Sequence, residues 1–266
     1  MNLARSLTAV LLATLAGMPA SDAQRPTSPG AKPTIVLVHG AFADASSWQD
    51  VIPLLQDHGY SVIAVQNALA SLAGDVETTK RVIAAQAGPV VVVGHSYGGA
   101  VISGAAAGNP NVRALVFIAA FAPEAGEPID AFQKKYPADL GTSVKPDAAG
   151  FLYIDVAKFH AVFAADVPER RARVMAVTQK PIFGAIFGQS VPGAAWKTIP
   201  SWYIVTLKDH SINPDLERFY ARRINARTTE ISSSHVPFIS HPGEVAKLIE
   251  TAATTDERTA AKRARP

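Results

Sequence analysis

The sequence predicts an α/β fold in which a doubly wound, mostly parallel sheet is covered by helices on both faces. Runs of β-branched and apolar residues alternate with helical patterns along most of the chain. Several runs are apolar throughout, as expected of strands buried on both faces of a parallel sheet. The chain has 266 residues, 48% of them hydrophobic and 18% charged, which suits one domain with a substantial core.

The predicted elements of this domain occupy residues 34–252. Strands are expected where apolar or β-branched residues follow one another, at residues 34–38, 61–65, 90–93, 113–117, 202–207 and 228–232. Helices are expected where apolar residues recur at helical spacing, at residues 48–58, 71–86, 100–108 and 242–252. Gly59 is placed to end the first of these helices. Strands and helices therefore alternate as in a parallel sheet.

The N-terminal residues 1–23 have the pattern of a secretory signal peptide. Arg5 is basic, residues 7–18 are apolar, and Ser21-Asp22-Ala23 forms a small-x-small cleavage site. A membrane anchor is the alternative, but the apolar segment is shorter than the roughly 20 residues that a span needs. We expect cleavage after Ala23 and a periplasmic or secreted protein without a membrane span.

The segments that flank the domain differ from it in composition. Residues 24–33 are rich in proline with serine and glycine between, which predicts a linker. Residues 253–266 are expected to form a flexible tail. Four basic and two acidic residues fall at positions 251–266, so the end of the chain carries two of the three net positive charges. The folded body therefore lacks the dense basic patch of a nucleic-acid-binding protein.

The absence of cysteine limits the possible chemistry. It excludes a disulfide framework, a thiolate zinc site and a cysteine nucleophile. The chain also lacks a phosphate-binding loop that ends in Gly-Lys-Ser/Thr. We expect neither a cofactor nor a metal ion. Stability has to come from the hydrophobic core.

Residues 90–99 read VVVVGHSYGG, which predicts a buried strand, a sharp turn and a helix. The turn contains G-x-S-x-G, in which glycines flank the serine because side chains would collide there. A dinucleotide-binding turn is the alternative, but that turn would require glycine at position 96. Ser96 is therefore the candidate nucleophile, beside the N–H groups that begin the helix.

A serine nucleophile needs a general base that a third group orients. His235 directly follows the last predicted strand, at the edge of the sheet where the turn with Ser96 also opens. His241 precedes a proline at a helix start and is the second candidate. His39 and His95 flank glycines in strand-end turns and are expected to support the backbone. The sequence favours His235 as the base.

The carboxylate that orients the base has two candidates. Asp209 comes immediately after the strand at residues 202–207, again at a carboxyl end. Asp215 lies in the first turn of a predicted helix, where the helix dipole explains an acidic residue without catalysis. We favour Asp209. The order Ser96, Asp209, His235 is then the chain order of a nucleophile, acid and base triad.

An oxyanion needs two preorganised N–H donors. One is expected to be the N–H of Tyr97, directly after the nucleophile, and the other the N–H of Ala41 in the turn after the first strand. Phe42 and Phe121, which follow strand ends, and Trp196 are the expected substrate contacts.

The alternation of strands and helices fails at residues 123–200. Short helix-like pieces are separated there by proline and glycine, which predicts a small helical cap. More than half of the phenylalanines of the chain lie in this segment. They could serve only to attach the cap to the sheet. A cap at this point of the chain would nevertheless cover Ser96.

Four motifs together resemble the α/β-hydrolase superfamily over residues 34–252. They read VLVHGAFADASSW, GHSYGGAV, Asp209-x-x-Ile212 and SHVPFISHP, and they are similar to the branch that holds plant methylesterases, hydroxynitrile lyases and bacterial pyrethroid-type carboxylesterases. The resemblance implies a triad of Ser96, Asp209 and His235. It also implies oxyanion donors at Ala41 and Tyr97, and a small helical cap.

The resemblance also distinguishes between reactions. Lyases of this branch carry threonine where this chain has Gly40 and lysine where it has Val236. We therefore expect a serine hydrolase that cleaves small, largely apolar carboxylic esters through an acyl-enzyme. Perhydrolase, haloperoxidase-like or lyase activity on the same triad is an alternative, as is a non-catalytic ligand-binding protein. Dehalogenases and most epoxide hydrolases of the superfamily use aspartate at position 96. The sequence does not indicate an oligomeric state.

Overall fold

The computed structural model describes residues 32–255. The expected signal peptide, most of the expected linker and the end of the expected tail lie outside these residues, so signal cleavage and export stay predictions. Within residues 32–255, no helix has both the length and the apolar character that a membrane crossing requires.

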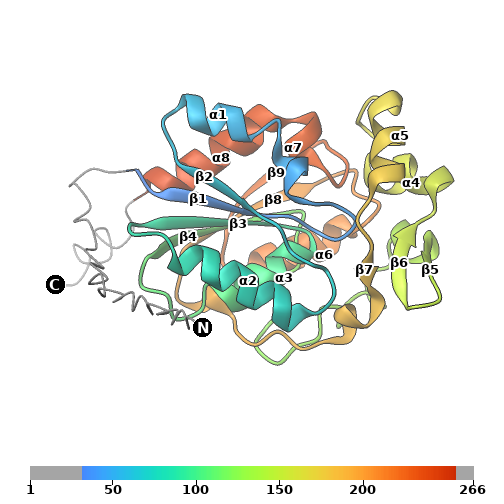
Figure 1. The fold of residues 1–266 in the computed structure, drawn as a ribbon, viewed down its shortest axis with the longest axis horizontal. Coiled ribbons are helices and arrows are strands. Elements are labelled where there is room, and N and C mark those ends of the chain that lie inside the picture. The colour runs from blue at the N-terminus through green and yellow to red at the C-terminus, as the bar shows by residue number, and fades with distance from the viewer. Residues whose placement is uncertain (1–31, 256–266) are drawn as a thin grey trace, which may run out of the picture.

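The body of the protein is a six-stranded sheet with the order β2-β1-β3-β4-β8-β9, in which all neighbouring strands are parallel (Figure 1). Its strands are β1 (Thr34–Val38), β2 (Val62–Val65), β3 (Val90–His95), β4 (Val112–Ile118), β8 (Ser201–Thr206) and β9 (Arg227–Ile231). The two central strands β3 and β4 are almost completely buried, as their β-branched sequences require. The predicted fold class is confirmed.

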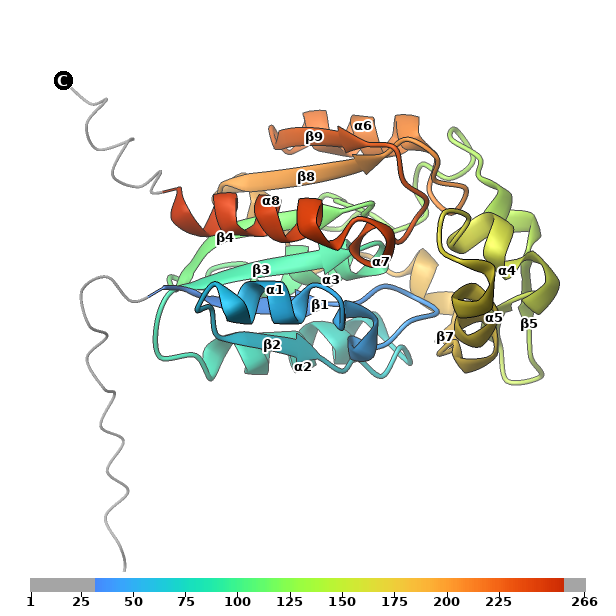
Figure 2. The ribbon, with the colours of Figure 1, turned by 90° about the horizontal axis from the view of Figure 1, so that it is seen from above.

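Helices cover both faces of this sheet (Figures 1 and 2). One face holds α1 (Ile52–Asp57), the short α7 (Pro237–Ser240) and α8 (Pro242–Thr254), and the other holds α2 (Leu72–Ala84), α3 (Tyr97–Ala105) and α6 (Pro214–Arg223). Small residues along α3 bring it close to the sheet. Most bounds differ from those expected by one to four residues; in particular, α3 begins directly after Ser96, and α8 continues two residues into the expected tail.

The strand order places a crevice beside β3. The chain goes outward from β1 to β2 on one side, then crosses to β3 and continues through β4, β8 and β9 on the other side. In such open sheets the loops that leave neighbouring strands diverge where the winding direction reverses, and ligands bind there. The carboxyl ends of β1 and β3, which carry Ala41 and Ser96, lie at this point.

Most of residues 123–200 forms a cap at the carboxyl ends of the strands, as Figure 2 shows. It contains α4 (Val156–Phe163) and α5 (Glu169–Thr178). The expectation of a helical cap was incomplete, because the cap also contains a three-stranded antiparallel sheet of β5 (Val144–Pro146), β6 (Phe151–Ile154) and β7 (Ile182–Phe183). Gly150, with a φ of 85°, makes the turn between β5 and β6 that a residue with a side chain rarely makes.

Short 3-10 helices complete the described chain, at Ala45–Trp48, Asp139–Thr142, Gly184–Gly188 and Ala195–Lys197. The last of them packs against α3 in the body of the protein. The final part of residues 123–200 therefore returns to the side of the sheet and does not cover the carboxyl ends of its strands.

Candidate active site

Ser96 occupies a strained turn between β3 and α3. Its backbone has φ 52° and ψ −120°, which costs a non-glycine residue on the order of 1–3 kcal/mol. The flanking glycines are required by space. A Cβ atom on Gly94 would lie 2.6 Å from the carbonyl oxygen of Gly98, and one on Gly98 would lie 2.6 Å from the carbonyl oxygen of Val38. The turn thus presents the Ser96 side chain to the cavity described below.

The structure brings Asp209 and His235 together because they leave the carboxyl ends of the adjacent strands β8 and β9. His235 Nδ1 lies 2.5 Å from Asp209 Oδ2. Asp209 Oδ1 accepts the backbone N–H groups of Ser211, at 2.6 Å, and Ile212, at 2.9 Å. The carboxylate is therefore held from both sides, and its orientation fixes that of the imidazole.

The electrostatics keep this carboxyl ionised. Burial by itself would raise the pKa of Asp209, but the charge of His235 and the hydrogen bonds that Asp209 accepts outweigh burial and lower it. An ionised Asp209 stabilises the proton on His235 Nδ1. His235 Nδ1 is thus occupied by Asp209, and His235 lines the same cavity as Ser96.

Two further buried histidines support the backbone of the site, as expected. His95 Nε2–H donates to the carbonyl oxygen of His235 at 2.9 Å. His39 Nδ1–H donates to the carbonyl oxygen of Gly40 at 2.8 Å, and its Nε2 accepts the N–H of Asn67 at 3.1 Å. Burial lowers the pKa of His95 well below its usual range and that of His39 to about 4, so both rings are neutral.

The second candidates for base and acid lie elsewhere. His241 precedes α8, and its Nδ1 lies 2.9 Å from the hydroxyl of Ser240. It does not line the cavity that holds Ser96. Asp215 is exposed in the first turn of α6, where it pairs with Arg218 at 3.0 Å. The helix dipole and this ion pair account for Asp215.

The expected oxyanion donors flank Ser96. Tyr97 is the first residue of α3, so its N–H has no partner within the helix. Ala41 follows β1 and lines the cavity with Ser96. The Tyr97 side chain has a structural contact of its own, because its hydroxyl donates to Asp75 Oδ2 on α2 at 2.8 Å. Burial and the charge of Asp75 raise the pKa of this phenol, so it stays protonated.

A cavity of 430 Å³ lies between the sheet and the cap, and both Ser96 and His235 line it. Phe42 and Phe121 line it as expected. The cap adds Phe163 and Phe187, two of the phenylalanines expected there. Leu140 and Leu152 of the cap and Leu216 of α6, which sequence reasoning did not single out, also line it. Among the described residues that line this cavity there is no aspartate, glutamate, lysine or arginine. The site therefore offers a largely apolar surface beside the serine, without acidic, lysine or arginine side chains among the described lining residues.

Trp196, the third expected substrate contact, lies away from the cavity that holds Ser96. The Trp196 Nε1–H donates to the carbonyl oxygen of Pro123 at 3.1 Å, and the side chain does not line the cavity of Ser96. The reason is topological, since residues 195–197 pack against α3 at the side of the sheet. Aromatic content alone did not distinguish the part of residues 123–200 that covers the site from the part that returns to the body.

The cap also holds the two loops that carry Asp209 and His235. Asp166, between α4 and α5, accepts the backbone N–H of Ser234 at 3.0 Å and also accepts the Ser234 hydroxyl. The hydroxyl of Ser211 donates to the carbonyl oxygen of Val162 at 2.6 Å. Burial opposes ionisation of Asp166, but the hydrogen bonds from Ser234 outweigh it and lower the pKa of this carboxyl.

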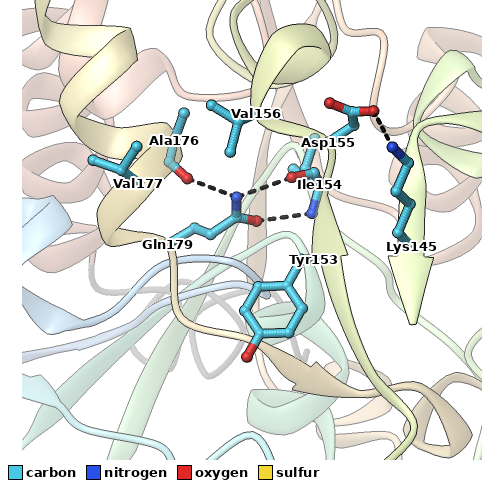
Figure 3. Close-up of a pocket in the computed structure, with 8 residues that line it drawn as sticks. All are labelled: Lys145, Tyr153, Ile154, Asp155, Val156, Ala176, Val177 and Gln179. Atoms are coloured by element: carbon cyan, nitrogen blue, oxygen red, sulfur yellow. Dashed lines mark hydrogen bonds and ion pairs between the residues drawn. The ribbon is translucent and has the colours of Figure 1, made fainter. Parts of the chain in front are cut away.

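Figure 3 shows a second depression, on the cap itself. The side-chain amide of Gln179 lies at its centre, donates to the carbonyl oxygens of Ile154 and Ala176 and accepts the N–H of Ile154. Lys145 and Asp155 form an ion pair of 2.6 Å at one side. These polar groups already bind one another, so they join α5 to β6 and account for the depression as a structural feature of the cap.

Comparisons with known proteins agree with this geometry. Residues 35–248 match the model of the Alpha/beta hydrolase family. The Probable hydrolase R7 of a Phoma species is 25% identical over 82% of this chain and 97% of its own length. The Pyrethroid hydrolase of Sphingobium wenxiniae is 27% identical over 81% of this chain and 85% of its own length.

The fold of a solved plant enzyme is also similar. The crystal structure of polyneuridine aldehyde esterase, an enzyme known from Rauvolfia serpentina, superposes with a TM-score of 0.72 at 20% identity, over 83% of this chain and 99% of that one. The sequence relatives, which include the pyrethroid hydrolase and polyneuridine aldehyde esterase, match the branch that the sequence motifs resemble. The chain therefore belongs to the alpha/beta hydrolase family.

Proposed function

We propose that this chain, a carboxylesterase-type hydrolase by its relatives, cleaves carboxylic esters through an acyl-enzyme on Ser96. One observation carries the proposal. Ser96, on its strained turn, and His235, oriented by Asp209 at 2.5 Å, line the same apolar cavity. This arrangement provides a nucleophile, a base and a group that fixes the base.

The residues would act in two steps. His235 takes the proton of the Ser96 hydroxyl as its oxygen attacks the ester carbonyl carbon, and the N–H groups of Ala41 and Tyr97 stabilise the oxyanion. The C–O bond to the alcohol then breaks, and the alcohol leaves with the proton from His235. A water molecule next gives a proton to His235 and attacks the acyl group, and Ser96 regains its proton as the acid leaves.

The cavity supports small, neutral and largely apolar esters as substrates. An anionic group bound in it would lose its hydration without gaining a cationic partner from the described lining residues. Each methylene that the cavity removes from water contributes about 0.8 kcal/mol, which corresponds to nearly fourfold in rate constant. The cavity volume of 430 Å³ limits how far this gain can continue.

A lyase reaction is disfavoured because position 40 has too little space for a side chain. A Cβ atom added to Gly40 would lie 2.8 Å from Ser96 Cβ and 2.8 Å from His95 Nδ1. The threonine that lyases of this branch carry at this position does not fit here unless the nucleophile turn moves. This contact supports hydrolysis as the main reaction.

A series of neutral acyl esters of increasing chain length tests the proposal, with an anionic ester of matched size as comparison. We expect kcat/KM to rise over the first few carbons, the anionic ester to react poorly, and Ser96→Ala to lose at least about 10⁴-fold in kcat. His235→Ala should be similarly inactive, whereas the matched variant His241→Ala should keep most of the activity. Turnover by Ser96→Ala, or fastest cleavage of the anionic ester, would contradict the proposal.

A further inference from the structure

Glu217 is a buried carboxyl group that none of the roles above uses. It lies on α6, which packs against β8, and its side chain has no exposed surface. A glutamate is rarely buried without a cationic partner, because desolvation of the carboxylate is costly. Thr206, the last residue of β8, donates its N–H and offers its hydroxyl to Glu217, and the Asp209 carboxyl also lies close to Glu217.

Thr206 connects Glu217 to the triad. The N–H of Thr206 donates to Glu217 Oε2 at 2.9 Å. The Thr206 hydroxyl oxygen lies 2.9 Å from Glu217 Oε1 and 3.1 Å from Asp209 Oδ2. The same Asp209 oxygen lies 2.5 Å from His235 Nδ1. A continuous line of hydrogen-bonding groups therefore connects Glu217, Thr206, Asp209 and His235.

Counting protons assigns the direction of these bonds. A hydroxyl has one proton, so Thr206 can donate to only one of the two carboxyl groups. If both carboxyls were ionised, the Thr206 hydroxyl oxygen would lie against one of the two carboxylate oxygens with no proton between them. Asp209 accepts three N–H groups and is the anion of the triad. Glu217 therefore carries the extra proton: with Glu217 Oε1–H donating to Thr206 and Thr206 donating to Asp209, both contacts of the Thr206 hydroxyl contain one proton.

We propose that Glu217 is a neutral carboxylic acid in the folded protein and, through the Thr206 hydroxyl, positions Asp209 from behind. The titratable groups around it agree with this assignment. Burial and the charge of Asp209 raise the pKa of Glu217 well above its usual range. Burial raises the pKa of the Tyr203 phenol on β8 well above its usual range, so Tyr203 is neutral too.

A neutral acid here has a chemical consequence. It donates toward the triad carboxylate without adding a second negative charge beside the Asp209–His235 pair. An ionised Glu217 would favour the protonated form of His235, which cannot act as a base. Glu217 is thus a positioning residue that acts through Thr206, and its role in turnover rests on the proposed function.

The protonation state can be tested without any substrate, by urea unfolding of wild type and Glu217→Gln between about pH 5 and 7. The unfolded wild type releases the Glu217 proton above about pH 4.3, whereas the folded protein keeps it. The ratio of the two unfolding constants, wild type over variant, should therefore rise about tenfold per pH unit. Glu77→Gln, at an exposed position of α2, is the matched control and should run parallel to wild type.

A ratio that does not change with pH would show an ionised Glu217 and overturn the proposal, whatever reaction the protein catalyses. Infrared spectroscopy gives a second reading, since the carbonyl band of a protonated carboxylic acid at neutral pH should disappear in Glu217→Gln. Persistence of the same band in the variant would contradict the assignment.

The positioning role is tested by a matched pair at Thr206. Thr206→Val removes the hydroxyl but keeps the branched shape, and we expect kcat for a neutral ester to fall about tenfold with little change in KM. Thr206→Ser restores the hydroxyl and should recover most of kcat. An unchanged kcat in Thr206→Val would refute the positioning role, whereas an inactive wild type would instead refute the proposed function.

Discussion

His39 illustrates, at the scale of single residues, how folding fixes the protonation of groups near the site. Its ring has no exposed surface and lies under the turn that leads to Ala41. Burial lowers its pKa to about 4, against an ordinary value of 6.5. Between these two pH values the unfolded chain binds a proton on His39 that the folded protein does not bind.

This difference predicts the acid sensitivity of the protein. Stability should fall as the pH falls from 6.5 toward 4, with a contribution from His39 of up to about 1.4 kcal/mol per pH unit. His39→Gln removes the titrating ring, so its free energy of unfolding should depend less steeply on pH in this window. Urea unfolding at several pH values measures the slope, and His58→Gln, at an exposed histidine, is the control. Equal slopes for wild type and His39→Gln would contradict the account.

The sequence revealed some residues of the site and concealed others. Ser96 could be predicted because its turn needs glycine at positions 94 and 98, and this requirement appears in the sequence as the G-x-S-x-G motif. Asp209 and His235 could be placed because each directly follows a strand. Glu217 was missed since a charged residue on an amphipathic helix is normally exposed. Its one signal is that it lies three residues before Tyr220, on the buried face of α6.

At the scale of elements, the cap is hydrogen-bonded to the loops that carry Asp209 and His235. The segment between α4 and α5 holds Ser234, next to His235, through Asp166. The end of α4 holds Ser211, two residues after Asp209, through the carbonyl of Val162. The cap therefore does more than enclose the cavity, because it helps to fix the loops from which the acid and the base project.

The anchor at Asp166 gives a prediction for the cap. Asp166→Asn replaces one acceptor oxygen with a donor that faces the N–H or hydroxyl of Ser234. We expect kcat to fall about fivefold, the equivalent of about 1 kcal/mol, because Asp166 is partly exposed and its hydrogen bonds are correspondingly weaker. Steady-state kinetics with a neutral ester measure the effect. Asp155→Asn, in the same cap but paired with Lys145, is the control.

If Asp166→Asn and Asp155→Asn have the same kcat as wild type, the cap does not hold the loop of His235.

The internal structure of the cap was the part of the fold that the sequence predicted least well. Its short strands pair with each other over two to three residues, too few for a periodicity to appear. Trp196 was misplaced for the related reason that nothing local marks where the chain returns to α3.

At the scale of the whole molecule, the order of the strands determines the place of the site. The winding direction reverses between β1 and β3, and the turns after these strands bring Ala41 and Ser96 to one crevice. The strands β8 and β9 then add Asp209 and His235 from the other side. This arrangement could be predicted because alternating strands and helices restrict the sheet to few topologies. The cavity shape depends on the cap and could not.

The central claim is that Ser96 becomes covalently acylated, and covalent labelling tests it most directly. An organophosphate ester with a chromogenic leaving group should release one equivalent of that group per chain and abolish activity. Mass spectrometry should then place one adduct on the peptide that contains Ser96, and Ser96→Ala should take no label. An adduct on another serine of the cavity, such as Ser211, or sustained ester turnover by a fully labelled protein, would contradict the account.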